Sequence, residues 1–184
     1  MVWIIIIVII VLLIGWLIAI YNNLIKLREN VHNAMGQIAA QVESRWDAIT
    51  NLMQATQKYQ SYEQETLEKI VNARTSVTDR ASVADIDDDQ QQFASVLGVV
   101  NALAEQYPDL KASGVYQQTM TAVDEFENKV RLSRMVYNDT VTKLNRAVQI
   151  FPNFLIAGPM GFTKETYFKN TDGKQEMPQW DPKN

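Results

Sequence analysis

The chain has 184 residues, a formal net charge of −4 and no cysteine. Its first twenty residues carry no charged side chain, and the remainder has the size and apolar content of one domain that can bury a core. This composition excludes a polytopic transporter, a freely soluble enzyme and a disordered protein, and the lack of cysteine excludes disulfides, thiolate zinc sites and cysteine nucleophiles. The cations are scattered singly, so no nucleic acid is expected as a partner.

Residues 2–20 form an apolar run that only Gly15 interrupts. The run is as long as the roughly 20 residues that a helix needs to cross a hydrocarbon core. No basic segment precedes it, and residues 16–21 do not resemble a small-residue cleavage site. We therefore predict a retained transmembrane anchor in contact with the lipid bilayer, not a cleaved signal peptide.

The residues that flank the anchor favour one orientation. Trp3 lies near one end, and Trp16 and Tyr21 lie near the other, as in the aromatic belts of membrane interfaces. Lys26 and Arg28 follow the anchor, so the positive-inside rule favours a single-pass protein whose C-terminal domain is cytoplasmic.

A helical pattern begins where the anchor ends. Apolar residues recur every three or four positions with heptad-like spacing, which predicts a helix that leaves the membrane and continues to about residue 60, with a bend at 21–23 left open. The predicted inner stripe is Leu24, Leu27, Val31, Ala34, Ile38, Val42, Trp46, Ile49, Met53, Thr56 and Tyr59.

Three further helices follow in the same way. We expect a second helix from about 61 to 77, a third from about 90 to 106 that stops before Pro108, and a fourth from about 113 to 149. Residues 152–184 are rich in Gly and Pro and are predicted to be loop. The fold class is therefore all-α, with three parts: an anchor at 1–20, a long antiparallel bundle of about four helices at 21–151, and a C-terminal tail at 152–184.

Residues that often carry chemistry are few. His32 is the single histidine, and a di-iron site of the Glu-x-x-His type would need a second one. The carboxylates of Asp124 and Glu127 are expected to be solvated. The acidic run 85–89 lacks the Gly and closing Glu of a calcium loop and is predicted to be a solvated loop or helix start. We therefore predict no catalytic residue, metal or cofactor, and the protein is not expected to be an enzyme.

Polar residues on or beside the apolar stripes are more informative. Buried polar side chains need partners, so these residues are expected to pair across helices and to fix the register of the bundle, with a binding site as the alternative. The predicted structural polar clusters contain Arg45, Asp47, Asn51, Arg74, Asn128, Arg134, Asn138 and Asn145.

Short motifs follow one another in a fixed order from the anchor to about Phe168. They are Tyr21-Asn22, Leu24, Leu27-Arg28, Asn33-Ala34, Gln37-Ile38, Arg45-Trp46-Asp47-Ala48-Ile49-Thr50-Asn51-Leu52, Glu65-Thr66-Leu67, Ala73-Arg74, Tyr107-Pro108-Asp109-Leu110-Lys111, Glu127-Asn128-Lys129, Tyr137-Asn138, Asn145, Phe151-Pro152, Gly161-Phe162 and Tyr167-Phe168. In this order they resemble the motifs of the LemA family. Thr50 stands where the family has a proline, and Met35-Gly36 stands where it usually has a tryptophan.

The resemblance implies a membrane-anchored antiparallel helical bundle in the bacterial cytoplasmic (inner) membrane, with no catalytic residues to carry over. Together with the long amphipathic extension of the anchor, it favours a structural or interaction protein that self-associates as a homo-oligomer or acts as a scaffold. The alternative is an adaptor or sensor for another membrane protein, such as a protease or an envelope-stress component.

Overall fold

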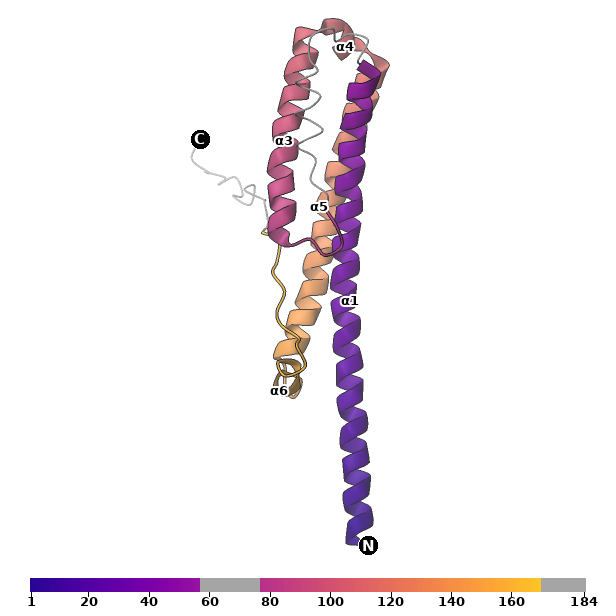
Figure 1. The fold of residues 1–184 in the computed structure, drawn as a ribbon, viewed down its shortest axis with the longest axis vertical. Helices are drawn as coiled ribbons and strands as arrows, with labels where there is room; N and C mark the ends of the chain where they lie inside the picture. The colour runs from indigo at the N-terminus through magenta and orange to yellow at the C-terminus, as the bar shows by residue number, and fades with distance from the viewer. Residues whose placement is uncertain (57–76, 170–184) are drawn as a thin grey trace, which may run out of the picture.

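The computed structural model describes residues 1–56 and 77–169 (Figure 1). The helices are α1 (Val2–Thr56), α3 (Val83–Gln106), α4 (Pro108–Ala112), α5 (Gly114–Gln149) and α6 (Phe154–Ala157). No strand occurs in these two ranges, so the predicted all-α class is confirmed. The predicted helix at 61–77 lies outside the described residues except for Val77, which belongs to the loop before α3.

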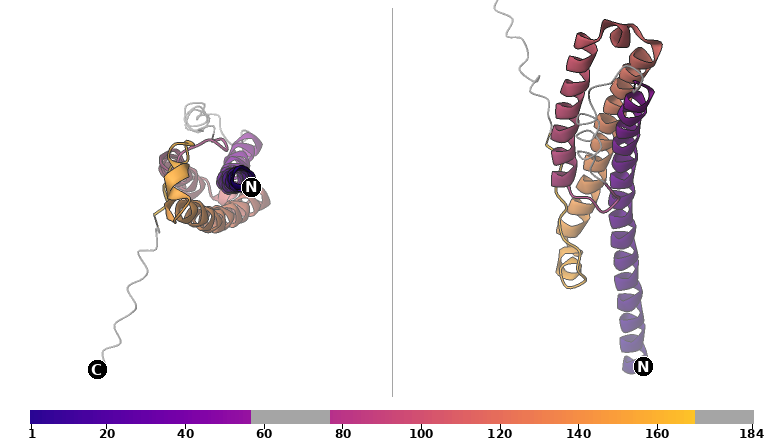
Figure 2. Two further views of the ribbon diagram at one scale, coloured as in Figure 1. Left: turned by 90° about the horizontal axis from the view of Figure 1, so that it is seen from below. Right: turned by 45° about the horizontal axis from the view of Figure 1, so that its top comes forward.

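The long helices run side by side along one axis. α1 and α3 point the same way, and α5 returns antiparallel to both, with α4 making the connection at the end far from the N-terminus (Figures 1 and 2). α1 extends well beyond the other helices at its N-terminal end. The molecule is thus a helical rod with one helix projecting from it.

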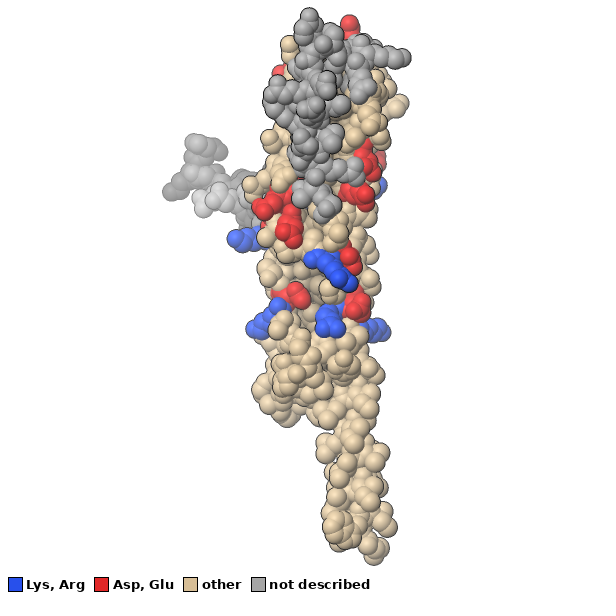
Figure 3. All heavy atoms as spheres, viewed as in Figure 1, with Lys and Arg blue, Asp and Glu red and all other residues tan. Residues whose placement is uncertain are grey.

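The projecting part of α1 is the predicted anchor. Its side chains are almost all exposed, and α1 is long and apolar enough to cross a membrane. α1 is continuous through Tyr21, Asn22 and Asn23, so the bend that the sequence left open does not occur. Figure 3 shows that the projecting end carries no Lys, Arg, Asp or Glu on the face in view.

The core lies between α1, α3 and α5. The stripe predicted on α1 is buried from Leu24 to Met53 except for Leu27, which is half-buried, and Trp46, Ile38 and Ile49 are fully enclosed. Tyr59, its last predicted member, lies outside the described residues. Most of the apolar residues that make the third and fourth predicted helices periodic also lie in the core, and Leu97, Tyr116, Met120 and Val148 pack against it half-buried. The buried ones are Phe93, Val96, Val100 and Leu103 on α3, and Val123, Val130, Tyr137, Val141 and Leu144 on α5.

α3 begins seven residues before the predicted start. Ser82 Oγ accepts a hydrogen bond from Asp85 N, and Asp85 Oδ2 accepts one from Ser82 N at 2.7 Å, which makes a capping box. These hydrogen bonds with Ser82 lower the pKa of Asp85. The acidic run 85–89 therefore belongs to the first turns of the helix, where carboxylates are favourable, and does not precede it.

The connection to α5 follows the predicted boundaries. α3 ends at Gln106, and Pro108 is the first residue of the short helix α4, which the sequence analysis did not predict. Ser113 Oγ accepts from Tyr116 N at 3.2 Å and so caps α5 at the predicted position.

The region predicted as a loop tail is only partly a loop. Residues 154–157 form α6, and Gly161 adopts a φ of 76°, a left-handed conformation that glycine tolerates and other residues rarely adopt. Phe162 N then bonds Ala157 O at 2.9 Å, which closes α6 and sends Phe162 back onto α1. The prediction of a tail without helix is therefore wrong for 154–157, because a single helical turn is too short to show a periodic pattern.

Candidate functional site

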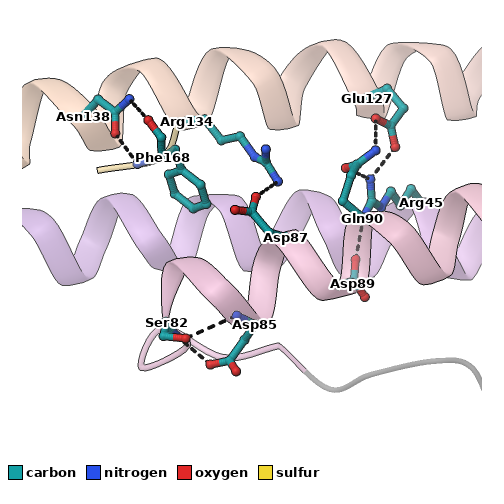
Figure 4. A network of polar contacts seen from close by, with 10 residues as sticks. All are labelled: Arg45, Ser82, Asp85, Asp87, Asp89, Gln90, Glu127, Arg134, Asn138 and Phe168. Atoms are coloured by element: carbon teal, nitrogen blue, oxygen red, sulfur yellow. Dashed lines mark hydrogen bonds and ion pairs between the residues drawn. The ribbon is translucent and has the colours of Figure 1, made fainter. Parts of the chain in front are cut away.

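A buried polar network joins the three long helices near the middle of the bundle. Arg45 of α1 is completely buried, and its guanidinium group forms ion pairs with Asp89 of α3 and Glu127 of α5. Nη1 of Arg45 also donates to Gln90 Oε1 at 2.8 Å, and Gln90 Nε2 donates to Glu127 Oε2 at 3.3 Å. Figure 4 shows these side chains converging from three helices onto one guanidinium group.

Aromatic side chains enclose this network. Trp46 Nε1 donates to Asp89 Oδ1 at 2.8 Å, so the buried Asp89 carboxylate accepts from two neighbouring residues of α1. The Phe93 ring lies 4.3 Å from the Arg45 guanidinium carbon and 5.0 Å from the Trp46 ring centre, edge to face. A charge without partners here would be costly, and the network gives the buried Arg45 one carboxylate partner on α3 and one on α5.

A second ion pair lies further along α5. Nη2 of Arg134 is 3.2 Å from Oδ1 of Asp87, at an angle that falls short of a good hydrogen bond, and the Arg134 guanidinium carbon lies 4.7 Å from the Phe168 ring. Partial burial lowers the pKa of Arg134, and the negative charge of Asp87 opposes that shift. This pair links α3, α5 and the segment that carries Phe168 (Figure 4).

Two asparagines of α5 hold the segment 163–168 along the helix. The Asn145 amide exchanges two hydrogen bonds with the backbone of Glu165, at 2.8 and 2.9 Å, and the Asn138 amide exchanges two with Phe168, at 2.9 and 3.1 Å. Seven helical residues rise about 10.5 Å, and three extended residues span about 10 Å, so the two spacings match. The segment runs antiparallel to α5, and its backbone amide and carbonyl groups bond the two asparagine side chains in the way that a strand bonds a neighbouring strand.

Tyr137 of α5 also bonds the segment 163–168 and makes the stability of this contact depend on pH. Its hydroxyl donates to Thr166 O at 3.3 Å, and burial, with a smaller contribution from Glu165, raises the pKa of Tyr137 to about 12. The ordinary pKa of tyrosine is 10.0, so folding favours the neutral hydroxyl of Tyr137. Its contribution to the free energy of unfolding is fully present below pH 10 and is lost as the pH rises through about 12.

We expect the stability of the wild type to fall more steeply between pH 10 and 12 than that of Tyr137→Phe, with a difference on the order of 2 kcal/mol. Denaturant unfolding of both proteins at a series of pH values measures it. Parallel curves would contradict the assignment.

A groove of about 700 Å³ opens beside the two ion pairs. Charged side chains of both signs from α3, α5 and the segment after α6 line it, together with the apolar Val130. The residues that line it are Asp87, Gln90, Gln91, Glu127, Asn128, Val130, Arg131, Arg134 and Lys169. The groove therefore presents charged groups and the alkyl parts of side chains to a ligand or a peptide, and it includes Gln90 and Glu127 of the network.

The structure places seven of the eight predicted polar residues, in three different settings. Arg45, Arg134, Asn138 and Asn145 make the contacts described above, but in separate clusters along α1 and α5. Asp47 and Asn51 lie on the exposed face of α1. Asn128 is exposed on α5 and its Nδ2 donates to Asp124 O in its own helix. Arg74 lies outside the described residues.

The sequence analysis missed the acidic partners. It assigned Asp89 to a solvated run, yet this side chain is fully buried, and it assigned Glu127 to the wet face, yet this carboxylate pairs with Arg45. Helical spacing was the available signal, since Asp89, Phe93, Val96 and Val100 lie on one stripe once α3 begins at Val83. His32 is exposed on α1, and the described residues contain no group of three or more metal-ligating side chains.

Comparison with known proteins identifies the family of this chain. The family model described as LemA matches residues 34–181. The chain belongs to the LemA family. The family match covers α3, α5, the network around Arg45 and the held segment 163–168, and it starts within α1, after the apolar run.

Curated relatives extend the comparison. The chain is similar to Protein LemA of Metamycoplasma hominis, with 30% identity over 134 residues, which are 71% of this chain and 60% of that protein. It is also similar to Magnetosome protein MamQ 2 of Paramagnetospirillum magneticum, with 30% identity over 77 residues, 42% of this chain and 28% of that protein. This LemA family chain thus covers less than two thirds of either relative's length. Neither name describes an enzyme.

Proposed function

We propose that this LemA family protein is a membrane-anchored, non-enzymatic protein that self-associates into a homo-oligomeric scaffold. The family, the apolar length of α1 and the non-enzyme names of the relatives support the membrane-associated, non-enzymatic part. The observation that carries self-association is an apolar patch on the outer face of α5. The bacterial inner membrane with a cytoplasmic bundle is the location that we propose, from the cations after the anchor.

The α5 patch consists of Leu132, Met135 and Val136. These side chains are 55%, 59% and 47% exposed and follow helical i, i+3, i+4 spacing on the face opposite the core. Exposed lysines and acids flank the patch along α5, namely Lys129, Asp139 and Lys143. An apolar stripe rimmed by charges of both signs is typical of a helix that packs against another protein.

The common anchor orients the copies for this contact. Copies inserted in the same membrane have parallel spans, so their α5 patches lie at the same height above the bilayer. The patch of one copy can therefore contact the same patch of another copy, related by a rotation axis along the membrane normal. Three side chains bury less area than a stable interface in solution requires. Confinement to a membrane raises the effective concentration, which favours a contact of this size.

Charge placed on the patch should dissociate the oligomer. We expect Leu132→Glu with Met135→Glu to convert a defined homo-oligomer of the full-length chain into a monomer, because buried carboxylates at the contact repel and lose their hydration. Native mass measurement of the detergent-extracted protein gives the stoichiometry. In membranes, cross-linking through Val136→Cys in this cysteine-free chain reports the same contact before and after the two Glu substitutions.

Val99→Glu is the matched control, since Val99 is a 44% exposed apolar residue on α3, outside the patch. It should leave the oligomer intact. A wild-type monomer in both assays, or an oligomer that the two Glu substitutions leave unchanged, would refute self-association through α5.

The groove beside the network favours the alternative, an adaptor for another membrane protein. Its walls carry Arg131 and Lys169 as well as Asp87 and Glu127, which suits a polar peptide with charges of both signs. The same mass measurement separates the two functions. A monomer with one stoichiometric protein partner, lost on Arg131→Glu with Lys169→Glu, supports the adaptor, whereas a homo-oligomer unaffected by these substitutions supports the scaffold.

A further inference from the structure

A second exposed apolar surface lies where α5 turns into α6. We call residues 150–160 the corner. Its large side chains face outward: Phe151 is 76% exposed, Leu155 58% and Phe154 51%, with Ile150 and Met160 also exposed. The sequence from 147 to 163 contains no charged residue and is bounded by the exposed cations Arg146 and Lys164.

Contacts with α1 fix the height of the corner. Leu24 of α1 is fully buried against Ala147, Ala157 and Phe162, and the Phe162 ring lies 5.8 Å from the Tyr21 ring, edge to face. The apolar run of α1 ends at residue 20. The corner is thus packed at the level where the candidate membrane span ends.

The corner points toward the same end of the molecule as the span. Figures 1 and 2 show α6 at the end of α5 nearest the N-terminus, beside α1, which continues past it. On the face shown in Figure 3, the charged side chains stop before this level. A bilayer that α1 crosses up to Tyr21 therefore has its headgroup boundary at the corner.

The charges around the corner match such a boundary. The guanidinium carbon of Arg28 lies 4.9 Å from the Phe162 ring. Exposed Arg146 and Lys164 flank the corner in the sequence, and exposed Lys26 lies two residues after Leu24. Exposed apolar side chains next to a group of cations are typical of interfacial membrane contacts. The apolar side chains are buried among the acyl chains, while the cations bind the anionic headgroups.

We propose that the corner is a second membrane contact, which inserts Phe151, Phe154 and Leu155 into the lipid leaflet from which α1 emerges. This inference rests on the proposed anchoring by α1. The partner is the lipid surface itself, since the corner continues the apolar surface of the span at the same height. Two contact points fix the rotation of the bundle about α1 and hold the α5 patch at a set angle to the membrane.

Depth-dependent quenching tests this contact in the full-length chain. The protein has no cysteine, so Leu155→Cys gives a single site for an environment-sensitive fluorophore. In vesicles of phosphatidylcholine and phosphatidylglycerol, we expect blue-shifted emission and strong quenching by lipids that carry a nitroxide near the headgroup end of the acyl chain. Val115→Cys is the matched control, because this exposed apolar residue lies at the other end of α5, about 50 Å away along the helix, and should not be quenched.

Ile10→Cys separates the two hypotheses. Quenching at Ile10→Cys by a nitroxide deep in the acyl chains, without quenching at Leu155→Cys, would overturn the corner contact and leave the anchor intact. No quenching at Ile10→Cys would overturn anchoring itself. Blue-shifted emission at Leu155→Cys that nitroxide lipids do not quench would show a protein occupant, such as a second copy, and would also overturn the proposal.

A charge variant gives an independent readout. With the fluorophore at Met160→Cys, adding Phe151→Asp and Leu155→Asp should remove most of the lipid quenching while circular dichroism stays unchanged, since both side chains are exposed in the fold. Undiminished quenching in this variant would contradict insertion of the corner.

Discussion

Replacing Arg45 with Met is expected to lower the free energy of unfolding by about 3–5 kcal/mol, the usual cost of breaking a buried ion pair from one side. Methionine fills much of the same space, so the loss is mainly electrostatic. Asp89 is fully buried and loses its cation, while the one-third exposed Glu127 regains part of its hydration. Urea unfolding of the full-length chain in detergent, followed by circular dichroism, measures the change as a shift in midpoint.

Two companion variants make this result specific. Arg45→Met with Asp89→Leu should recover a large part of the loss, because no isolated charge remains, although Trp46 Nε1 then lacks its acceptor at a cost of about 1–3 kcal/mol. Arg131→Met, an exposed arginine on α5, should change stability by less than about 0.5 kcal/mol. Equal midpoints for Arg45→Met and the wild type would show that the network does not hold the bundle together.

The second large effect is expected at the held segment 163–168. Leucine at both Asn138 and Asn145 removes the four hydrogen bonds that the two amides make with the backbone of Glu165 and Phe168. Each bond contributes about 1 kcal/mol, so the free energy of opening the segment should fall by up to the sum of the four bonds. Hydrogen exchange of the Glu165 and Phe168 amides should then accelerate by up to about a thousandfold. Exchange measured by NMR or mass spectrometry compares these two amides with the amides of α5.

Asn128→Leu is the control for this experiment, because the described hydrogen bonds of Asn128, to Asp124 O and from Arg131, stay within α5. It should leave exchange at Glu165 and Phe168 unchanged. If the double variant behaves like this control, the buried rings of Phe162 and Phe168 hold the segment without the asparagines.

Periodicity predicted the long helices because burial follows it closely. Val31, Ile38, Val42, Trp46 and Ile49 recur with helical spacing and are all buried in one core. Pro108 and Ser113 marked where α3 ends and α5 begins, since each acts through local backbone geometry. The anchor followed from composition alone.

The polar network could be predicted only in part. Arg45, Arg134, Asn138 and Asn145 stood out as polar residues along apolar stripes, but their partners come from distant elements and no local pattern names them. Asp89 lies 44 residues from Arg45, and Glu127 lies 82 residues away. Asp89 was hidden in an acidic run in which Asp85 and Asp88 are exposed and Asp87 is half-buried.

The same limit applies to the tail. Residues 163–168 have no periodicity, and their order comes from Asn138 and Asn145 on another element. The corner was hidden for a related reason, because exposed Phe151, Phe154 and Leu155 have meaning only once packing against Leu24 sets their height.

The unbroken passage of α1 through Tyr21, Asn22 and Asn23 makes the bundle a lever on the bilayer. Thr56 lies about 54 Å along the helix from Ile20, so a span that tilts by about 20° carries that end sideways by about 18 Å. Span tilt responds to bilayer thickness. If the proposed corner inserts into the leaflet, tilt toward α6 would push it deeper into the bilayer, so a change in bilayer thickness would displace the distal α4 end mainly away from α6.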